Sequence, residues 1–343
     1  MFVLGDDKHV VCGETRSGGP CDVECNALPP IKSGTVPTVS VVMGVYNAER
    51  TVRAAVDSIL NQSFGDFEFI IVDDGSTDST GRILAEYAES DARVHVIKQT
   101  NQGLTRSLIT GTSQGRGEFI ARQDADDVSL PDRLERQIAW LAADDQAVLA
   151  TSWVEDFSRE GVSCGLHKTL EHCVRLSSGM SHGLVGIPAH GSVLMRRRSL
   201  ERAGGYRVCF YYAQDSDLWL RLSEFGKFLV VPEVLYRRLV GTESISSRFR
   251  PAQTRYSDLA IECFRAVKEG RSEAAFVEEA EKLADNCRKS KGQTPSRYEQ
   301  ATSMLLIAAQ LRQRDPSLAN KYLWTGLKTC PWHLRLWKAL FVH

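Results

Sequence analysis

Hydrophobic and polar positions follow two alternating patterns between residues 39 and 142. Continuous apolar runs at 39–45 and 67–72 are typical of strands buried on both faces of a sheet. After the first run, Val52, Val56 and Leu60 recur at helical spacing, which predicts an amphipathic helix with Asn47 as its N-cap. The alternation repeats about every 25 residues, and therefore predicts βαβ units with a mostly parallel sheet.

The same patterns predict the remaining elements and a division into three parts. Strands are expected at 93–97, 118–122, 147–153, 192–196 and 228–232, and helices at 104–112, from Pro131 onward and at 215–225. Residues 1–36 are rich in Gly, Pro and Ser without periodicity, which is typical of a flexible leader. An α/β domain is expected at 37–250. A helical C-terminal region is expected at 251–343, where the pattern is helical and interrupted by prolines.

Two acidic clusters follow predicted strands. Asp73 and Asp74 end the second strand, and Asp124, Asp126 and Asp127 end the strand at 118–122. Ligands of open α/β sheets bind beyond the carboxyl ends of the strands. Closely spaced carboxylates repel one another unless a cation neutralises them, and hard oxygen ligands suit Mg²⁺ or Mn²⁺. The alternative for each cluster is an Asp-rich turn that caps the following helix.

Composition narrows the class of protein. The 43% hydrophobic and 25% charged residues are ordinary for a globular protein, and the net charge of −1 gives no global attraction to nucleic acid. No signal peptide or bilayer-spanning run is evident, so a cytoplasmic location is expected. The nine cysteines are scattered and are expected to be reduced. The group His9, Cys12, Cys21 and Cys25 matches no standard zinc spacing.

Several ordered segments resemble glycosyltransferase family 2. They are VSVVMGVYNAERTVRAAVDSILNQSF, DFEFIIVDDGSTDST, NQGLTRSL, GEFIARQDADDVSLPDRLERQ, HGSVLMRR, AGGYR and QDSDLWLRL, and together they extend over residues 38–250. The resemblance implies the GT-A fold, in which a Rossmann-like, mostly parallel sheet joins a mixed acceptor-binding half. It also implies a nucleotide-sugar donor, inversion at the anomeric carbon, and Mg²⁺ or Mn²⁺ as cofactor.

The same resemblance assigns the donor site residue by residue. Tyr46 and Asp74 would contact the nucleobase and its neighbouring groups, because an aromatic face can stack on uracil and a carboxylate can accept from its ring N–H. Asp124 matches the donor-facing carboxylate, and Asp126 and Asp127 match the metal-binding pair. Arg122 is placed with the donor-binding residues as the group that orients these carboxylates. The alternative for Arg122 is an ordinary ion pair at the end of a strand.

For the acceptor side, Asp215 matches the catalytic base, which takes a proton from the attacking hydroxyl. Trp219 lies four residues further on, so it would share a helical face with Asp215 and either shape the acceptor pocket or pack in the core. This chain departs from the family pattern at three positions. Gly44 replaces a small hydroxyl residue, Gln214 replaces a glutamate, and Gly241 replaces a histidine.

The predicted function is transfer of a sugar, with a UDP-sugar as the expected donor, to a saccharide or lipid-linked acceptor in cell-surface polysaccharide or glycolipid assembly. The departures at Gln214 and Gly241 motivate one alternative, a non-catalytic nucleotide-sugar-binding protein. A sugar-phosphate nucleotidyltransferase is another. It needs a Gly-rich, basic loop after the first strand, and residues 45–48 (VYNA) offer none.

The last helical segment has an amphipathic pattern. Its apolar residues fall at nearly helical spacing among basic residues; they are Trp332, Leu336, Trp337, Leu340 and Phe341. Such a segment can lie in a membrane interface, which would place the protein peripherally at the inner face of the membrane. The alternative is that this helix packs back on its own domain.

Overall fold

A computed structural model describes residues 36–169, 187–241, 250–289 and 296–341. Over these residues the chain forms a nine-stranded mixed sheet in the order β3-β2-β1-β4-β8-β6-β9-β5, with β7 paired to β6. The strands are β1 (Val39–Val45), β2 (Phe67–Asp73), β3 (Val94–Lys98), β4 (Phe119–Arg122), β5 (Val128–Ser129), β6 (Ala147–Phe157), β7 (Ser163–His167), β8 (Leu194–Arg196) and β9 (Lys227–Leu239).

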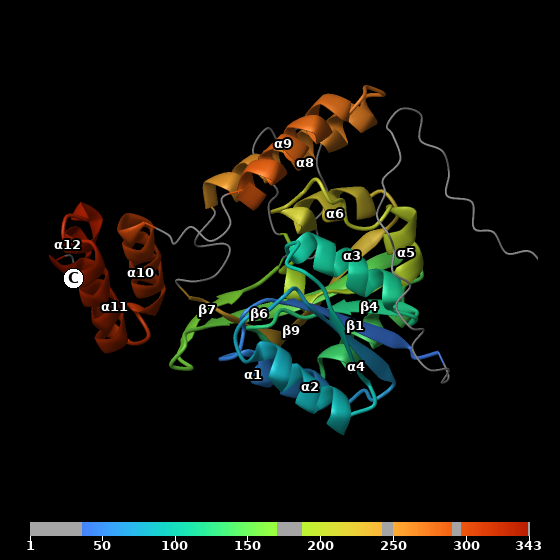
Figure 1. The fold of residues 1–343 in the computed structure, drawn as a ribbon, viewed down its shortest axis with the longest axis horizontal. Helices are drawn as coiled ribbons and strands as arrows, with labels where there is room; N and C mark the ends of the chain where they lie inside the picture. Colours follow the sequence, from blue (N-terminus) through green and yellow to red (C-terminus); the bar gives the residue numbers. More distant parts are fainter. Residues whose placement is uncertain (1–35, 170–186, 242–249, 290–295, 342–343) are drawn as a thin grey trace, which may run out of the picture. The chain divides into compact units, whose positions relative to one another are not determined.

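Helices cover both faces of this sheet in a three-layer arrangement (Figure 1). α1, α2 and α4 lie on one face, and α3, α5 and α6 lie on the other. The helices are α1 (Val52–Leu60), α2 (Thr80–Ser90), α3 (Leu104–Gln114), α4 (Arg133–Ala142), α5 (Arg197–Arg202), α6 (Gln214–Leu222), α8 (Arg250–Lys268), α9 (Ala274–Lys289), α10 (Arg297–Leu311), α11 (Pro316–Thr329) and α12 (Leu334–Phe341), with a 3₁₀ turn η1 (His190–Ser192).

The first half of the sheet is parallel because each strand returns through a helix. β1 pairs in parallel with both β2 and β4, and β2 with β3. Successive residues of β1 face opposite layers: Val41 and Met43 pack toward α1, whereas Val42 packs toward α3. Burial on both faces explains why these strands read as continuous apolar runs.

The second half is mixed. β8 runs antiparallel to both β4 and β6, while β6 and β9 are parallel. β9 is longer than the predicted 228–232 because its second part also pairs with β5 and with the end of β6. The predicted α/β class, with a parallel first half, a mixed second half and C-terminal helices, is confirmed.

Two predicted helix starts are wrong. Thr51, not Asn47, is the N-cap of α1. Asn47 has a positive φ of 49°, and its side-chain oxygen accepts a hydrogen bond from the Thr77 backbone N–H at 2.8 Å. It therefore links the loop after β1 to the loop after β2. Likewise α4 begins at Arg133 with Asp132 as N-cap, so Pro131 lies in the preceding turn.

The C-terminal helices form two groups with separate cores. Tyr256 and Leu259 of α8 pack with Leu220 of α6 and with α9. Helices α10, α11 and α12 pack around a second core that includes Cys164 of β7. None of the helices in the described ranges is long and apolar enough to cross a membrane.

Candidate active site

Three of the predicted site residues leave the sheet at one edge. Tyr46 follows β1, Asp74 follows β2 and Asp124 lies two residues beyond β4. Since these strands are parallel neighbours, the residues after them emerge at the same carboxyl edge. Tyr46 is 50% exposed at this edge. Its aromatic face is therefore available for stacking on a ligand.

Asp74 is nearly buried, with 3% exposure, and holds the loop before α3. One carboxylate oxygen accepts from the Gln99 side chain at 2.7 Å and from the Gln102 backbone N–H at 2.8 Å. The other accepts from the Gly103 backbone N–H at 2.7 Å. A carboxylate oxygen has about two lone-pair sites, so the second oxygen keeps capacity for one more donor.

Two fully buried arginines shape the loop that carries Asp124. Arg122 donates to the Val42 and Gln123 carbonyls and forms an ion pair with Asp124 at 2.5 Å. Arg133 donates to the Gly191 and Arg122 carbonyls, and burial lowers its pKa to about 10. Arg122 is thus beside Asp124 as predicted. Because it is buried, it is placed to act on a donor indirectly, by fixing the position of Asp124 and by its charge.

Asp126 and Asp127 have different surroundings. Asp126 is exposed, but protein surrounds it on most sides, and this desolvation together with the charge of Asp124 raises its pKa to about 6. Asp127 is buried, and one of its oxygens accepts from the Leu239 backbone N–H at 2.8 Å. Burial and then the charges of Asp126 and Asp124 raise the pKa of Asp127 well above its usual range. The cluster therefore concentrates negative charge where water solvates it poorly.

We expect the metal-free Asp126→Asn variant to melt about 2–4 °C higher than the wild type at pH 7, equivalent to about 1 kcal/mol after allowing for the exposure of Asp126. A carboxyl whose pKa is raised on folding contributes stability that is lost as the pH rises through the folded value, here about 6. The gain should therefore shrink at pH 4. Differential scanning fluorimetry at both pH values measures it, and a lower melting temperature at pH 7 would show instead that the carboxylate supports the fold.

Asp215 lies in the first turn of α6, in the second half of the domain, whereas Tyr46 and Asp74 follow strands of the first half. Ala213, the N-cap, has a positive φ of 52°, and one Asp215 oxygen accepts from the Ser216 backbone N–H at 2.8 Å. Burial raises the pKa of Asp215, and the negative charge of Asp124 adds to the rise. The two carboxylates are therefore close enough to interact electrostatically.

Asp217, on the same helix, has a different role from Asp215. Its carboxylate is buried and forms ion pairs with Arg207 and Arg221, so it fastens α6 to the chain around Arg207. Arg207 also pairs with Glu273 at 2.7 Å, beyond α8. Of the two acidic residues of α6, Asp215 is the one left available for chemistry.

His190 and Tyr206 pack with Trp219 on the side of α6 that carries Asp215, and of these three residues the sequence patterns singled out Trp219. The His190 Nε2 lies 2.7 Å from the Tyr206 hydroxyl, and the His190 ring packs edge-on against Trp219 with 5.8 Å between centroids. Burial lowers the pKa of His190 well below its usual range, and Arg122 lowers it further, so His190 is neutral. Trp219 is buried and also packs on Phe228, as expected of a core residue.

Gly191 and Tyr236 were missed at the sequence level. The Tyr236 hydroxyl accepts from the Asp124 backbone N–H at 3.2 Å. A Cβ atom at Gly191 would lie 1.9 Å from that hydroxyl and 2.8 Å from an Asp124 oxygen. A glycine is therefore required there. The glycine of HGSVLMRR was the available signal, since an isolated glycine often marks a close approach of backbone to other atoms.

Comparisons with known proteins identify the family of this chain. The family model described as Glycosyl transferase family 2 matches residues 40–204. A Bacillus subtilis protein designated glycosyltransferase EpsE is 36% identical over 241 residues, which are 68% of this chain and 82% of that protein. The chain belongs to glycosyltransferase family 2. It is accordingly a nucleotide-sugar-dependent glycosyltransferase.

Other relatives of this family 2 enzyme are longer or more distant. Escherichia coli chondroitin synthase is 31% identical over 213 residues, which are 62% of this chain but 30% of the synthase. Among solved structures, S. aureus TarS 1–349 in complex with UDP has a TM-score of 0.53 and 17% identity, covering 85% of this chain and 88% of that one. The mannosyltransferase PcManGT from Pyrobaculum calidifontis, in complex with GDP-Man and Mn²⁺, has a TM-score of 0.51 and 19% identity, with 90% of each chain covered. At these identities the two structures support the GT-A fold.

The departures from the family 2 pattern have different structural settings. At Gly44 an added Cβ would lie 3.0 Å from Leu104 and Ser107, so α3 packs too closely on β1 for a larger side chain without a shift. Gln214 is buried in the first turn of α6. Gly241 is the last described residue before a gap at 242–249, and the group His9, Cys12, Cys21 and Cys25 also lies outside the described residues.

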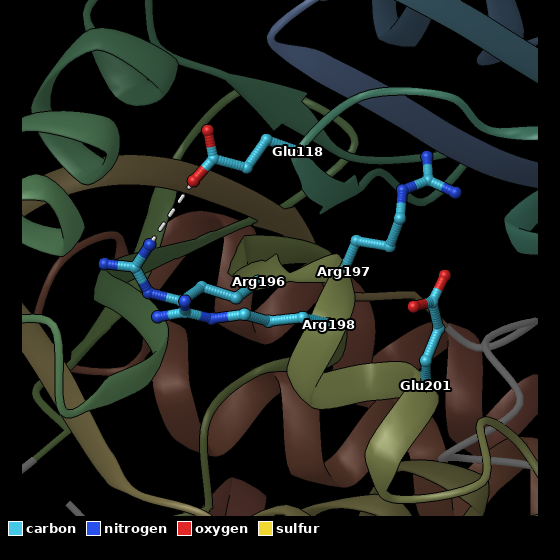
Figure 2. A pocket seen from close by; sticks show the side chains of 5 residues that line it. All are labelled: Glu118, Arg196, Arg197, Arg198 and Glu201. Atoms are coloured by element: carbon cyan, nitrogen blue, oxygen red, sulfur yellow. Dashed lines mark hydrogen bonds and ion pairs between the residues drawn. The ribbon is translucent and has the colours of Figure 1, made fainter. Parts of the chain in front are cut away.

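A hollow of about 160 Å³ lies at the opposite end of β4 (Figure 2). It is lined by Glu118, Arg196, Arg197, Arg198 and Glu201. Glu118 directly precedes β4, whereas Asp124 follows it, so the hollow and the acidic cluster are at opposite edges of the sheet. Arg196 pairs with Glu118 at 3.4 Å and donates to the Leu141 and Ala147 carbonyls. The guanidinium of Arg196 is therefore used in contacts that stabilise the fold. The candidate active site is the acidic cluster at the carboxyl edge.

Proposed function

We propose that this enzyme transfers a sugar from a UDP-sugar to a hydroxyl of a saccharide or lipid-linked acceptor, with inversion at the anomeric carbon, in cell-surface polysaccharide or glycolipid assembly. The observation that carries the proposal is that the 3₁₀ turn η1 links the two parts of the site: Gly191 lies against Asp124, and the neighbouring His190 packs against Trp219, one helical turn beyond Asp215. This arrangement supports Asp215 as a proton acceptor near the carboxylate cluster. The relative named chondroitin synthase, at 31% identity, supports a role in polysaccharide assembly.

In this proposal the nucleoside binds beyond the carboxyl ends of β1 and β2. The exposed ring of Tyr46 stacks on the base, and the free lone pair of Asp74 accepts its ring N–H. The three hydrogen bonds that Asp74 already makes keep its carboxylate fixed before the donor arrives. TarS 1–349 was solved with UDP and PcManGT, which has the same fold, with GDP-Man, so the donor screen compares both nucleotides.

Asp215 acts as the general base. An inverting transfer is a single displacement, in which the acceptor oxygen attacks the anomeric carbon as the diphosphate leaves and its proton passes to a base. Asp217 is unsuitable because two arginines hold its carboxylate. His190 is neutral and bonded to Tyr206, so together with Trp219 it is better suited to form a wall of the acceptor side.

We also propose Mg²⁺ or Mn²⁺ as cofactor, and the donor set fits such an ion. Asp126 is exposed, and its pKa is raised by desolvation and by the charge of Asp124 in spite of nearby arginines, while Asp127 has one oxygen not used by Leu239. These two residues would hold the ion, which would supply positive charge to the leaving diphosphate. In the described part of the chain no group of three or more His, Cys, Asp or Glu is arranged to hold a metal. A Mg²⁺ site typically has only one or two protein carboxylates and is completed by substrate phosphates and water, which agrees with a pair of aspartates.

The test is a donor screen with UDP-, GDP- and dTDP-sugars, read by thermal shift and by release of the nucleoside diphosphate. We expect UDP-sugars with Mn²⁺ or Mg²⁺ to raise the melting temperature and to release UDP. Excess EDTA should abolish release, and added Mn²⁺ should restore it. Full release in EDTA would exclude the metal role. Tight donor binding without release under any condition would favour the non-catalytic binding protein.

For the organisation of the chain, we propose residues 37–250 as the catalytic domain and 251–343 as an accessory helical region; of the predicted leader 1–36, residues 1–35 lie outside the described residues. The proposed location is the cytoplasm, with peripheral placement at the inner face of the membrane. Such a location would give the enzyme access to both a nucleotide sugar and a lipid-linked acceptor.

A further inference from the structure

Helix α12 carries apolar side chains on two opposite faces. Leu336 is fully buried in the core formed with α10 and α11, and Leu340 packs against the same core. Leu334, Trp337 and Phe341, at spacings of three and four residues, are instead exposed, at 74%, 39% and 76%. The inward face accounts for the packing of the helix. The outward apolar stripe has no partner in that core.

The outward stripe continues onto the neighbouring elements. Trp324 of α11 packs edge-on against Trp337 with 6.4 Å between ring centroids, and Trp332, in the preceding turn, is 65% exposed. The indole N–H of Trp337 donates to the Pro331 carbonyl at 2.7 Å, which satisfies its polar group and fixes its ring. We call this surface the tryptophan patch; it comprises Trp324, Trp332, Leu334, Trp337 and Phe341.

The charged residues of the segment that carries most of the tryptophan patch have one sign. Residues 316–343 contain no Asp or Glu, and their four cations are Lys321, Lys328, Arg335 and Lys338. Because the whole chain has a net charge of −1, the remaining residues together carry −5. Positive charge is therefore concentrated beside exposed tryptophans within one short segment.

We propose that the tryptophan patch docks on the headgroup region of an anionic lipid bilayer. Tryptophan rings are favoured at membrane interfaces because they combine a large apolar face with one polar N–H. Lysine and arginine beside such a face are attracted to anionic lipids. A second copy of this chain is a poorer occupant, because a two-fold contact would bring these four cations against the same four.

The docking rests on the peripheral membrane placement in the proposed function and names the surface responsible, but it uses no residue of the donor site and can be tested apart from catalysis. It is tested by co-sedimentation of the full chain with vesicles of pure phosphatidylcholine and of phosphatidylcholine mixed equally with phosphatidylglycerol. We expect at least about tenfold stronger partitioning to the mixed vesicles, weakened by salt. Absence of binding to the mixed vesicles would overturn the proposal.

Two variants separate the apolar and the charged contributions. Leu334→Ser combined with Phe341→Ser should reduce partitioning roughly tenfold or more. Arg335→Glu combined with Lys338→Glu changes only exposed residues and should also reduce it by at least about tenfold. Val267→Ser, which replaces an apolar residue of α8 that is also exposed, is the matched control and should bind like the wild type.

Partitioning that is equal in the wild type and both variants would overturn the proposal. So would a wild-type dimer that the variants dissociate without any change in vesicle binding, because the patch would then be a self-association surface. UDP release in solution is measured in parallel and should be unchanged by all three variants. A wild type that binds mixed vesicles but releases no UDP would contradict the proposed function and leave the docking surface standing.

Discussion

Replacing Asp215 with Asn is expected to lower kcat by about 10²- to 10⁴-fold, the usual contribution of a general base, while donor affinity persists. Asn keeps the shape of the side chain and removes its basicity. Burial and Asp124 raise the pKa of Asp215, so the negative charge disfavours the folded state at neutral pH. The variant should therefore melt no lower than the wild type. Steady-state kinetics, donor thermal shift and thermal melting measure the three quantities.

Asp217→Asn is the matched control on the same helix. It should lower the free energy of unfolding by about 1–3 kcal/mol, because it weakens the charge-assisted bonds of Arg207 and Arg221. Measured at a temperature where the variant is folded, its kcat should fall much less than that of Asp215→Asn. If Asp215→Asn keeps near-normal turnover, the base lies elsewhere. If it abolishes donor binding, Asp215 is a donor ligand.

The pH dependence gives an independent check on the base. Activity on the acid side requires the deprotonated carboxylate, so a raised pKa of Asp215 moves the acid limb of kcat/KM to higher pH than for an ordinary aspartate. Gln214→Glu adds a negative charge next to Asp215, raises this pKa further and should move the acid limb upward again. An unchanged limb in Gln214→Glu would argue that another group titrates.

Gly191→Ala should disrupt both the fold and the chemistry. The new Cβ would lie 1.9 Å from the Tyr236 hydroxyl and 2.8 Å from an Asp124 oxygen, so both groups have to move. Overpacking of this kind costs about 3 kcal/mol or more in stability. A displacement of about 1 Å in a positioning group can cost about 10²-fold in rate. We expect a loss of that order in kcat/KM, measured at a temperature where the variant is folded.

The control for Gly191→Ala is Gly65→Ala. An added Cβ at Gly65 has no atom within 4 Å, and the backbone there has no positive φ. This variant should match the wild type in melting temperature and UDP release. A Gly191→Ala enzyme that behaves like Gly65→Ala would contradict the role given to the contact between Tyr236 and Asp124.

Sequence patterns predicted the strands that form the centre of the sheet. The run at 39–45 coincides with β1, and 67–72 differs from β2 by one residue. These strands are buried on both faces, so their hydrophobic signal is uninterrupted. A local signal is weaker: Asn favours N-cap positions, which predicts that role for Asn47, but its side chain instead accepts from the Thr77 backbone N–H, 30 residues away.

The amino-acid pattern is sufficient to predict the alternation of strands and helices, the edge of the sheet at which Asp74 and Asp124 emerge, and the family to which these motifs point. These features depend on short segments, whose periodicity and turn residues can be read directly. Only the tertiary structure decided that Asp217 is locked by two arginines while Asp215 is free, that Arg122 is buried behind Asp124, and that Gly191 must lack a side chain because Tyr236 approaches it. The approach of Tyr236 to Gly191 and the burial of Arg122 against Val42 depend on contacts between residues far apart in the chain, and the pairing of Asp217 with Arg207 depends on how α6 packs on the preceding loop. Burial and neighbouring charge at such contacts are set by packing, and no local pattern records them.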